Sequence, residues 1–458
     1  ERRVWHYRRA KEDLIRRAIH DFNWEEELDR LSDSPEEQVS LFDRIIMNIM
    51  INFIPFVDKI FKPKDPPWVT RASKVLLHRY KRKYKKFSMK GCPSEEKGQI
   101  DELRAEYSNL IQTEKEKYMK SLGDAVSDPR TGHKKYWSAM KKLLKKSITT
   151  VIPPILFEGS FIMDPGEKCK KFNEYFKDQC KTIETSSILP PFTKKTNLSL
   201  NKVNFCEQSL LKHIRKLNIN KAHGHDEISV RMIKIGDKSL IKPLLIIYKN
   251  CIAKGYYPKK WKMANVIPCH KKNERNLISN YRPISLLPIC GKLFEKIIFD
   301  GIYNYIFINK FISNKQSGYR RNDSTVKQLL SITYEIYKAF DNAQDMIAVF
   351  LDISRAFDRV WHEGIIFKLK EIGIEGEYIN IVEDFLADRK QRVVIDGQKS
   401  DWTSIESGVP QGSILGPLLF LVYINDLIDS VESDIRIFAD DTFIFRIFDP
   451  SSIDALNR

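Results

Sequence analysis

The sequence predicts an α+β fold organised around a small antiparallel sheet, and three stretches carry that prediction. The first consists of two short apolar runs, 435–439 and 442–448, which flank the adjacent carboxylates Asp440 and Asp441. Ile, Phe and Thr favour a pleated, half-buried surface, whereas Asp-Asp favours a tight turn. We therefore expect a β-hairpin with acid at its tip. An Asp-Asp pair taken alone is most often a solvated turn, so a functional interpretation of this pair depends on the other two stretches.

The second and third stretches lie upstream of the hairpin. Residues 348–351 form an apolar run that leads directly into Asp352. Residues 407–417 form a loop with three glycines and two prolines that leads into an apolar helix. Glycines let a backbone approach another group closely, so the loop is suited to contact with a ligand.

Together the three stretches resemble the palm of a reverse transcriptase, specifically of the non-LTR (LINE-type, jockey-like) retrotransposon family. Asp352 matches the first catalytic aspartate, 407–417 the loop that positions template and substrate, and 438–441 the aromatic-Ala-Asp-Asp box. Further segments resemble motifs of the fingers, in the expected order, at 221–226, 258–261, 280–287 and 316–320. The resemblance covers roughly residues 205–448, and several ordered motifs are more specific than any single one.

The resemblance implies an RNA-directed DNA polymerase that copies RNA from a primer 3′-end with deoxynucleoside triphosphates. Joining a hydroxyl to an α-phosphate builds charge on the attacking and leaving oxygens. Two Mg²⁺ or Mn²⁺ ions about 3.5–4 Å apart stabilise both, and hard oxygen ligands select these ions. We expect Asp352 and Asp440 to bridge the metal pair. Asp441 is expected to be a secondary ligand or to shape the hairpin.

Two cations of the fingers are expected at the triphosphate. Arg282 is followed by Pro283, which stiffens its position, and a guanidinium grips two oxygens at once. Without the flanking motif, a surface ion pair would be the ordinary interpretation of Arg282. Lys271 resembles the other cation, but the segment departs from the family form, which leaves Lys271 and Lys272 as alternatives.

The nucleotide site is expected to include Phe357, Gln411 and Gly412. Phe357 stands five residues after Asp352, where a flat ring leaves no room for a 2′-hydroxyl. On spacing alone, Phe357 could equally be palm core. Gln411 is expected to touch the template strand while Gly412 permits the close approach, and Asp358 is expected to be structural.

The net charge of +17 and the pI near 9.3 favour polyanionic partners, here an RNA template and a DNA primer or target. The most basic stretch interleaves cations with Tyr80, Tyr84 and Phe87, and such mixtures suit phosphate contact and base stacking. A solvated helix face and a nuclear-localisation patch are the alternatives. The expected nucleic-acid contacts are Lys81, Arg82, Lys83, Lys85, Lys86 and, from the 316–320 motif, Arg320.

The expected organisation is a right-hand polymerase with fingers and an RRM-like palm sheet. It divides the chain into a helical basic connector at 1–150, a linker or entry segment at 151–204, fingers at 205–345 and a truncated palm at 346–458. The end of the palm and the thumb are expected to be absent. We therefore expect an uncovered edge on the hairpin strand, too few partners for Phe443, Phe445, Ile447 and Phe448, poor solubility and no processive synthesis by this chain alone.

The remaining features narrow the class of protein. The cysteines are scattered without a C-x-x-C pair, which gives no support for a disulfide framework or a zinc site. The early apolar window 41–61 contains charges and a proline, so it predicts a buried or amphipathic helix and not a membrane span. With no signal peptide visible, we expect a nuclear or cytoplasmic protein. Two alternatives stay open: a catalytically inactive, domesticated RNA-binding protein, and a group II intron-like or telomerase-like reverse transcriptase.

Overall fold

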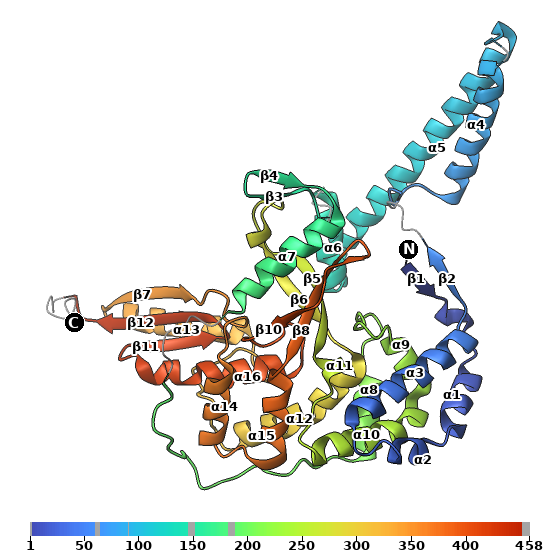
Figure 1. Ribbon diagram of the computed structural model, residues 1–458. Helices are drawn as coiled ribbons and strands as arrows, with labels where there is room; N and C mark the ends of the chain where they lie inside the picture. The colour runs from blue at the N-terminus through green and yellow to red at the C-terminus, as the bar shows by residue number, and fades with distance from the viewer. Residues whose placement is uncertain (1, 60–64, 90, 145–151, 182–187, 451–458) are drawn as a thin grey trace. The chain divides into compact units, whose positions relative to one another are not determined.

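The computed structural model describes residues 2–59, 65–89, 91–144, 152–181 and 188–450. The chain forms two compact units, drawn together in Figure 1. The minor unit consists of Glu1–Arg2 and Lys59–Val151, and the major unit consists of Arg3–Asp58 and Ile152–Arg458. The serines at 451 and 452 predict the start of a further helix, and this segment lies outside the described residues.

The minor unit is helical, as the sequence predicts. Its helices are α4 (Arg71–Met89), α5 (Ser94–Ser127) and α6 (His133–Leu143). In Figure 1, α4 and α5 run side by side in opposite directions as a long hairpin. Its buried apolar residues are Phe87, Ile100, Leu103, Leu122 and Ala139. The apolar seam is narrow, so most of the charged surface of the hairpin faces water.

Residues 3–58 pack within the major unit, whereas the sequence analysis grouped them with the connector expected over 1–150. They form β1 (Arg2–Trp5), α1 (Glu12–Asp21), α2 (Trp24–Asp29), α3 (Pro35–Phe53) and β2 (Phe56–Lys59). Ile15, Ile19 and Phe42 join the same hydrophobic core as the helices that follow residue 205. An amphipathic pattern predicts a buried face but not the partner that buries it, so sequence alone did not identify this packing.

The expected linker at 151–204 also contains folded structure. The hairpin strands β3 (Ile155–Phe157) and β4 (Ser160–Ile162) precede α7 (Pro165–Gln179). The Asp164 carboxylate caps α7 by accepting a hydrogen bond from the Glu167 amide, at 2.8 Å. α7 packs against β8, β9 and β10 and buries Phe172 and Phe176, so residues 165–179 are part of the folded unit.

Two sheets frame the major unit. The larger has the order β10-β8-β5-β6, with β9 pairing with β8, and the smaller has the order β11-β12-β7. The strands are β5 (Met263–His270), β6 (Tyr281–Leu286), β7 (Asp345–Asp352), β8 (Arg389–Ile395), β9 (Gln398–Lys399), β10 (Thr403–Ile405), β11 (Asp434–Phe438) and β12 (Asp441–Phe448). β5 pairs antiparallel with β6 and parallel with β8, so the larger sheet crosses the expected boundary at residue 345.

The other described helices of the major unit follow residue 205. They are α8 (Glu207–Lys216), α9 (Val230–Gly236), α10 (Ile241–Ala253), α11 (Lys259–Lys262), α12 (Ile289–Ile308), α13 (Thr325–Asp341), α14 (His362–Glu371), α15 (Gly376–Leu386) and α16 (Leu415–Ile424). Short 3-10 turns are η1 (Tyr7–Arg9), η2 (Asp237–Leu240), η3 (Ile278–Asn280) and η4 (Asn425–Ser430). The mixture of helices and sheets agrees with the predicted α+β class. In the described part of the chain, no helix combines the length and apolarity needed to cross a bilayer.

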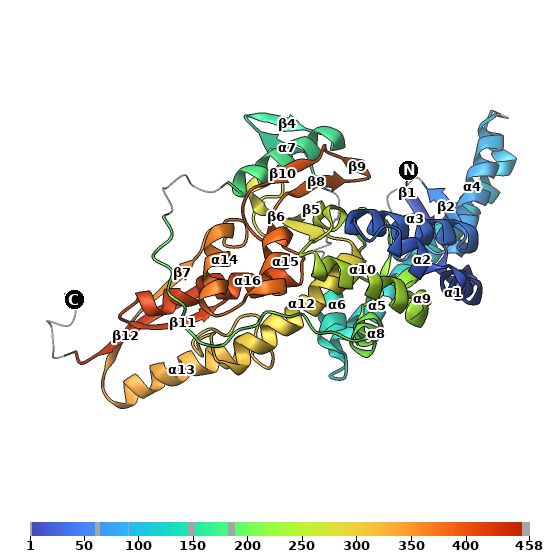
Figure 2. The same cartoon turned by 60° about the horizontal axis from the view of Figure 1, so that its bottom comes forward.

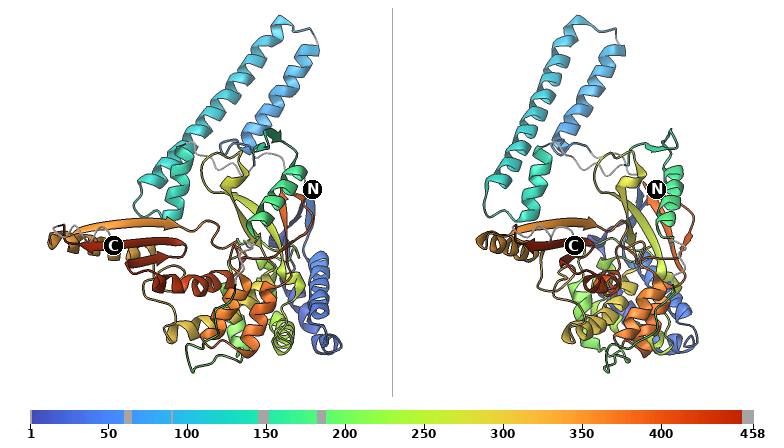
Figure 3. Two further views of the ribbon diagram at one scale, coloured as in Figure 1. Left: turned by 60° about the vertical axis from the view of Figure 1, so that its left-hand side comes forward. Right: turned by 90° about the vertical axis from the view of Figure 1, so that its left-hand side faces the viewer.

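The smaller sheet is sandwiched between helical elements. α13 contacts β7 and β11 and can be followed beside the sheet in Figure 2. On the other face, Ile428 of η4 packs with Ile435 and Ile437 of β11, and Figure 3 shows this helical layer beneath the sheet. Both arms of the hairpin are therefore held against helices.

The edge of the smaller sheet is not where we expected it. β12 lies between β11 and β7, so Phe443 and Phe445 are buried and the expectation that they lack partners is wrong. The outer strands of the described sheet are β11, which Gln316 bridges at Ile437, and β7, whose Phe350 is 78% exposed. The error arose because strand order, which depends on long-range pairing, is not encoded in the local apolar pattern.

Candidate active site

The predicted hairpin is confirmed, with Asp440 in its turn. β11 and β12 pair antiparallel from Asp434 opposite Phe445 to Phe438 opposite Asp441, which leaves Ala439 and Asp440 to make the turn. Ala439 has a φ of 59°, a left-handed value that is unfavourable for a residue with a Cβ. Asp440 is half-buried. The unfavourable conformation of this turn thus sets the position of the Asp440 carboxylate at the tip of the hairpin.

Asp352 is the last residue of β7 and lies opposite Asp441 in the strand register. Directly opposed residues of an antiparallel pair place their side chains on the same face, so these two carboxylates share a face of the sheet. Both line a pocket of about 340 Å³ between this face and α13, together with Gln328 and Ile332 of α13. The structure therefore brings together acids that are far apart in the sequence.

The electrostatics of Asp440 show that the acids lie close to one another. Burial raises the pKa of Asp440, the negative charges of Asp441 and Asp352 raise it further, and the positive charge of Arg282 lowers it. Like charges raise a carboxyl pKa only when they lie near it. The charges of Arg282, Asp352 and Asp441 therefore all act on Asp440.

The donor chemistry of this cluster fits a hard divalent cation. Carboxylate oxygens are the ligands that Mg²⁺ and Mn²⁺ prefer. In the described ranges, no three His, Cys, Asp or Glu side chains already form a complete chelating group. Mg²⁺ commonly uses only one or two carboxylates and completes its shell with water and substrate phosphates, so the open arrangement is compatible with it.

Arg282 and Lys271 lie on the β5–β6 hairpin. Arg282 is exposed on β6 with Cys269 as its cross-strand partner. Lys271 follows the end of β5, where its amide donates to the Asn280 carbonyl at 2.8 Å and its side chain is exposed. The positive charge of Arg282 lowers the pKa of Asp440, whereas no described interaction links Lys271 to the acids.

Phe357 lies in an aromatic cluster beside the acids. Its ring stacks on Phe420 of α16 with centroids 4.6 Å apart, and it meets the Tyr319 ring edge-on at 5.9 Å. It is half-buried against the main core, so the structure gives it both a packing role and an accessible side.

Tyr319 is a site residue to which the sequence analysis assigned no role. It is 51% exposed and has a left-handed φ of 53°. Burial raises the pKa of its hydroxyl, the charge of Asp440 raises it further and Arg282 lowers it. Tyr319 thus lies near the aromatic pair and the charged cluster. The signal for it in the sequence was its place within the 316–320 motif.

The side chain of Gln411 is hydrogen-bonded to Asp358 within the protein. Its Nε2 donates to both Asp358 carboxylate oxygens, at 2.9 and 3.1 Å. Its carbonyl accepts from the Ser285 amide at 2.8 Å, and a Cβ on Gly412 would lie 2.3 Å from the Ser285 carbonyl oxygen. The close approach expected at Gly412 is therefore to β6, the strand that carries Arg282. The structural role expected for Asp358 is confirmed.

Glu295 of α12 fixes the other end of the same loop and was missed. It is fully buried, and its Oε2 accepts from the amides of Ile414 and Leu415 at 2.6 and 3.1 Å. These amides are at the start of α16, where a negative charge is favourable. Burial raises the pKa of Glu295. A glutamate in the middle of an apolar helix was the available signal, because a carboxylate is rarely buried without a partner.

Arg320, expected to contact nucleic acid, is engaged within its own loop. Its Nη1 donates to the carbonyls of Ser313 and Gln316, at 3.0 and 2.8 Å. The guanidinium also lies over the Phe307 ring, 5.4 Å from its centroid. These contacts stabilise the loop over 313–320.

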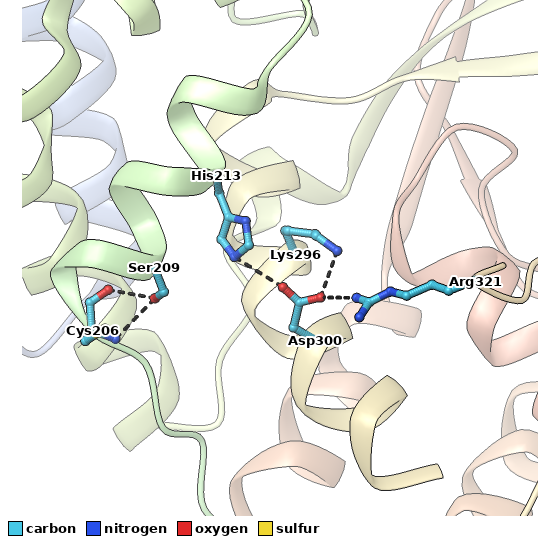
Figure 4. Close-up of polar contacts among 6 residues, drawn as sticks. All are labelled: Cys206, Ser209, His213, Lys296, Asp300 and Arg321. Atoms are coloured by element: carbon cyan, nitrogen blue, oxygen red, sulfur yellow. Dashed lines mark hydrogen bonds and ion pairs between the residues drawn. The ribbon is translucent and has the colours of Figure 1, made fainter. Parts of the chain in front are cut away.

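The next residue, Arg321, attaches the loop to α12. Its Nη2 donates to Asp300 at 2.8 Å, and the same carboxylate accepts from Lys296 at 2.8 Å and pairs with His213 at 3.2 Å, as Figure 4 shows. Burial opposes the ionisation of Asp300, but the hydrogen bonds and charges of His213 and Lys296 outweigh it and lower its pKa. Asp300 therefore joins α8, α12 and the loop.

The five expected cations of α4 are exposed in the minor unit. They are Lys81, Arg82, Lys83, Lys85 and Lys86. Tyr80 precedes them and Tyr84 lies among them, with ring centroids 5.8 Å apart, and Phe87 follows. The helix therefore has the interleaved cations and rings that the sequence predicts.

Comparison with known proteins confirms the expected resemblance. Residues 269–449 match the family described as reverse transcriptase (RNA-dependent DNA polymerase). The chain is 33% identical over 289 residues to the RNA-directed DNA polymerase from mobile element jockey of Drosophila melanogaster, which covers 61% of this chain and 30% of that protein. It is 34% identical over 221 residues to the probable RNA-directed DNA polymerase from transposon BS of the same organism, covering 48% and 24%. The chain thus spans less than a third of the length of these relatives.

Proposed function

We propose, on the premise of this match to the reverse transcriptases, that the chain carries the catalytic centre of a non-LTR retrotransposon RNA-directed DNA polymerase. It would copy RNA into DNA from a primer 3′-end. The observation that supports this most is the meeting of Asp352 and Asp441 on one face of the smaller sheet, with Asp440 in the adjoining turn. All three lie within the matched residues.

Asp352 and Asp440 would hold two Mg²⁺ or Mn²⁺ ions, with Asp441 as a secondary ligand or a residue that shapes the turn. When bound, such ions supply Lewis acidity to the attacking primer oxygen and the leaving pyrophosphate oxygen. The ions would also offset the repulsion that raises the pKa of Asp440.

The remaining side chains would bind and orient the substrate. Arg282, beside Asp440, would bind the triphosphate, since a guanidinium stays charged and can hold two oxygens. Lys271 would be a second cation further along the β5–β6 hairpin. Phe357 would exclude a 2′-hydroxyl with its accessible side. Gln411 and Gly412 would act by holding the loop on β6.

The minor unit would bind RNA or primer phosphates through the cations of α4. Their exposure and interleaving with Tyr80 and Tyr84 support this assignment, because rings can stack on bases while cations neutralise phosphates. The same surface would serve the alternative function, a catalytically inactive RNA-binding protein.

One experiment separates these functions. The full chain is mixed with Mg²⁺ and a DNA primer annealed to RNA, and addition of the single complementary deoxynucleotide is measured. We expect template-directed addition of that nucleotide and not of the three non-complementary ones. The matched control is the same reaction without the RNA template. Tight binding of the primer–template without any addition would refute the catalytic assignment and support the RNA-binding alternative.

A further inference from the structure

Gln316 makes its hydrogen bonds to the backbone of the acid-bearing turn. Its side chain is fully buried. Oε1 accepts from the Ala439 amide at 3.0 Å and from the Gly318 amide at 2.9 Å, and Nε2 approaches the Ala439 carbonyl at 3.4 Å. Both ends of one carboxamide therefore contact the residue that directly precedes Asp440.

The backbone around Gln316 holds the carboxamide in place. The Ser317 amide donates to the Ile437 carbonyl and the Ile437 amide donates to the Lys315 carbonyl, both at 2.9 Å. These bonds join the loop to β11 as a short parallel bridge at Gln316 and Ile437. These backbone hydrogen bonds therefore hold Gln316 beside the turn independently of the hydrogen bonds that its side chain makes.

Gly318 makes this contact sterically possible. A Cβ at Gly318 would lie 2.3 Å from the Ala439 nitrogen and 2.9 Å from the Ala439 Cβ. These distances leave no room for a side chain, and the opposing atoms at Ala439 belong to the backbone as well as to the methyl group. The loop and the turn are therefore fitted to each other at this point.

The turn needs such support because its conformation is unfavourable. A non-glycine residue with a left-handed φ costs on the order of 1–3 kcal/mol and persists when surrounding contacts determine it. Ala439, with φ 59°, has those contacts in Gln316 and Gly318. If they were lost, the peptide between Ala439 and Asp440 could rotate, and the Asp440 carboxylate would move with it.

We propose that Gln316 is a positioning residue for the polymerase reaction, acting through Ala439 to set the place of the Asp440 carboxylate. The inference rests on the proposed function for its catalytic consequence. It extends that function to a residue that contacts neither the substrate nor the acids. The far end of the loop is held independently by Arg320 and by the Asp300 cluster of Figure 4, so loss of the Gln316 side chain should not release the loop.

The first test replaces the carboxamide with an apolar group of similar size, Gln316→Met. Two buried amides then lose their acceptor, and we expect kcat for single-nucleotide addition to fall by about 10²-fold, as for a misplacement of about 1 Å. KM for the nucleotide should change little, because Gln316 does not contact the substrate, whereas a displaced Asp440 would stabilise the transition state less. Hydrogen exchange at the Ala439 amide should become faster, which is a readout independent of activity.

The second variant, Gln316→Glu, gives a pH signature. A protonated glutamic acid keeps an acceptor and a donor, as the amide does, whereas the ionised form loses the donor and adds a negative charge at Ala439, the residue before Asp440. We expect its kcat, relative to that of the unchanged chain, to be near normal at low pH and to fall as pH rises. A purely structural role would not make this ratio depend on pH.

Gln38→Met is the matched control. Gln38 is equally buried, donates to the Leu28 carbonyl and accepts from Asn250, far from the proposed reaction. Its loss should lower the unfolding temperature as much as Gln316→Met does and leave kcat unchanged. Equal loss of kcat in both variants would overturn the inference, as would unchanged kcat in Gln316→Met. If the unchanged chain adds no nucleotide, the proposed function fails. In that case, the rate of hydrogen exchange at the Ala439 amide in Gln316→Met, compared with that in the unchanged chain, still shows whether Gln316 holds the turn.

Discussion

Loss of the hydrogen bonds between Gln411 and Asp358 should lower the stability of the fold by an amount that depends on pH. Gln411→Ala removes the amide that donates to both oxygens of Asp358. Asp358 is 7% exposed, and burial raises its pKa to about 6, against the opposing effects of the Gln411 hydrogen bonds and of the charges of Arg355 and Arg389. The variant keeps the burial and loses the hydrogen bonds, so the pKa of Asp358 should rise further.

The sign and size of the effect on stability follow from this shift. A carboxyl whose pKa is higher in the folded than in the unfolded chain stabilises the fold least at high pH. At pH 8 Asp358 is ionised in the unchanged chain, and loss of hydrogen bonds to a charged group costs about 1.5–3 kcal/mol. At pH 5 it is largely protonated in both chains, so the loss should be smaller.

Denaturant unfolding at pH 5 and pH 8 measures both quantities. The matched control is the same substitution in an Asp358→Asn background, where the charged partner is absent. We expect Gln411→Ala to cost less there and to show no dependence on pH. A loss that is the same at both pH values, or that is fully additive with Asp358→Asn, would show that Gln411 does not act through Asp358.

Three other predictions concern the sugar, the template and a buried acid. Phe357→Ala should raise ribonucleotide relative to deoxynucleotide incorporation, because a smaller side chain admits the 2′-hydroxyl; unchanged selectivity in competition assays would make Phe357 a packing residue only. Replacing the five cations within 81–86 by Gln should weaken RNA binding and flatten its salt dependence, whereas an identical slope in titrations would assign them to another role. Asp226, whose Oδ1 is buried without a hydrogen-bond partner among the described residues, has a pKa raised to about 8 by burial and by Asp43. Because the pKa of Asp226 is raised in the folded chain, the stability of the unchanged chain should fall as pH rises from 3.8 to 8. The stability of Asp226→Asn relative to the unchanged chain should therefore be greater at pH 9 than at pH 5 in unfolding measurements. An equal stability difference at both pH values would contradict this prediction.

Local pattern was enough to predict the elements that carry the acids. The β11–β12 hairpin, the strand that ends at Asp352 and the helix after the glycine loop all follow from alternating apolar residues, turn residues and apolar runs. These signals are encoded in neighbouring residues. The order of the strands is not, which is why the sequence did not show that β12 lies between β11 and β7.

The supporting contacts could not be predicted, because each depends on residues brought together by folding. Gln316 meets Ala439 and Glu295 meets Leu415 across more than a hundred residues of sequence. Arg320 resembled a nucleic-acid contact as part of a motif, but its guanidinium is held by carbonyls of its own loop. A motif identifies which residues matter, and the structure shows what each side chain touches.

The most direct test of the account is single-turnover addition of one deoxynucleotide on an RNA template in Mg²⁺ by Asp440→Asn. The account predicts a loss on the order of 10³-fold or more, because an amide cannot replace a carboxylate that holds a catalytic cation. Affinity for the RNA should be unchanged. Asp434→Asn, an exposed acid at the far end of the same hairpin, is the matched control and should retain normal addition. Near-normal addition by Asp440→Asn would contradict the central claim that the acids in and beside this turn carry out the reaction.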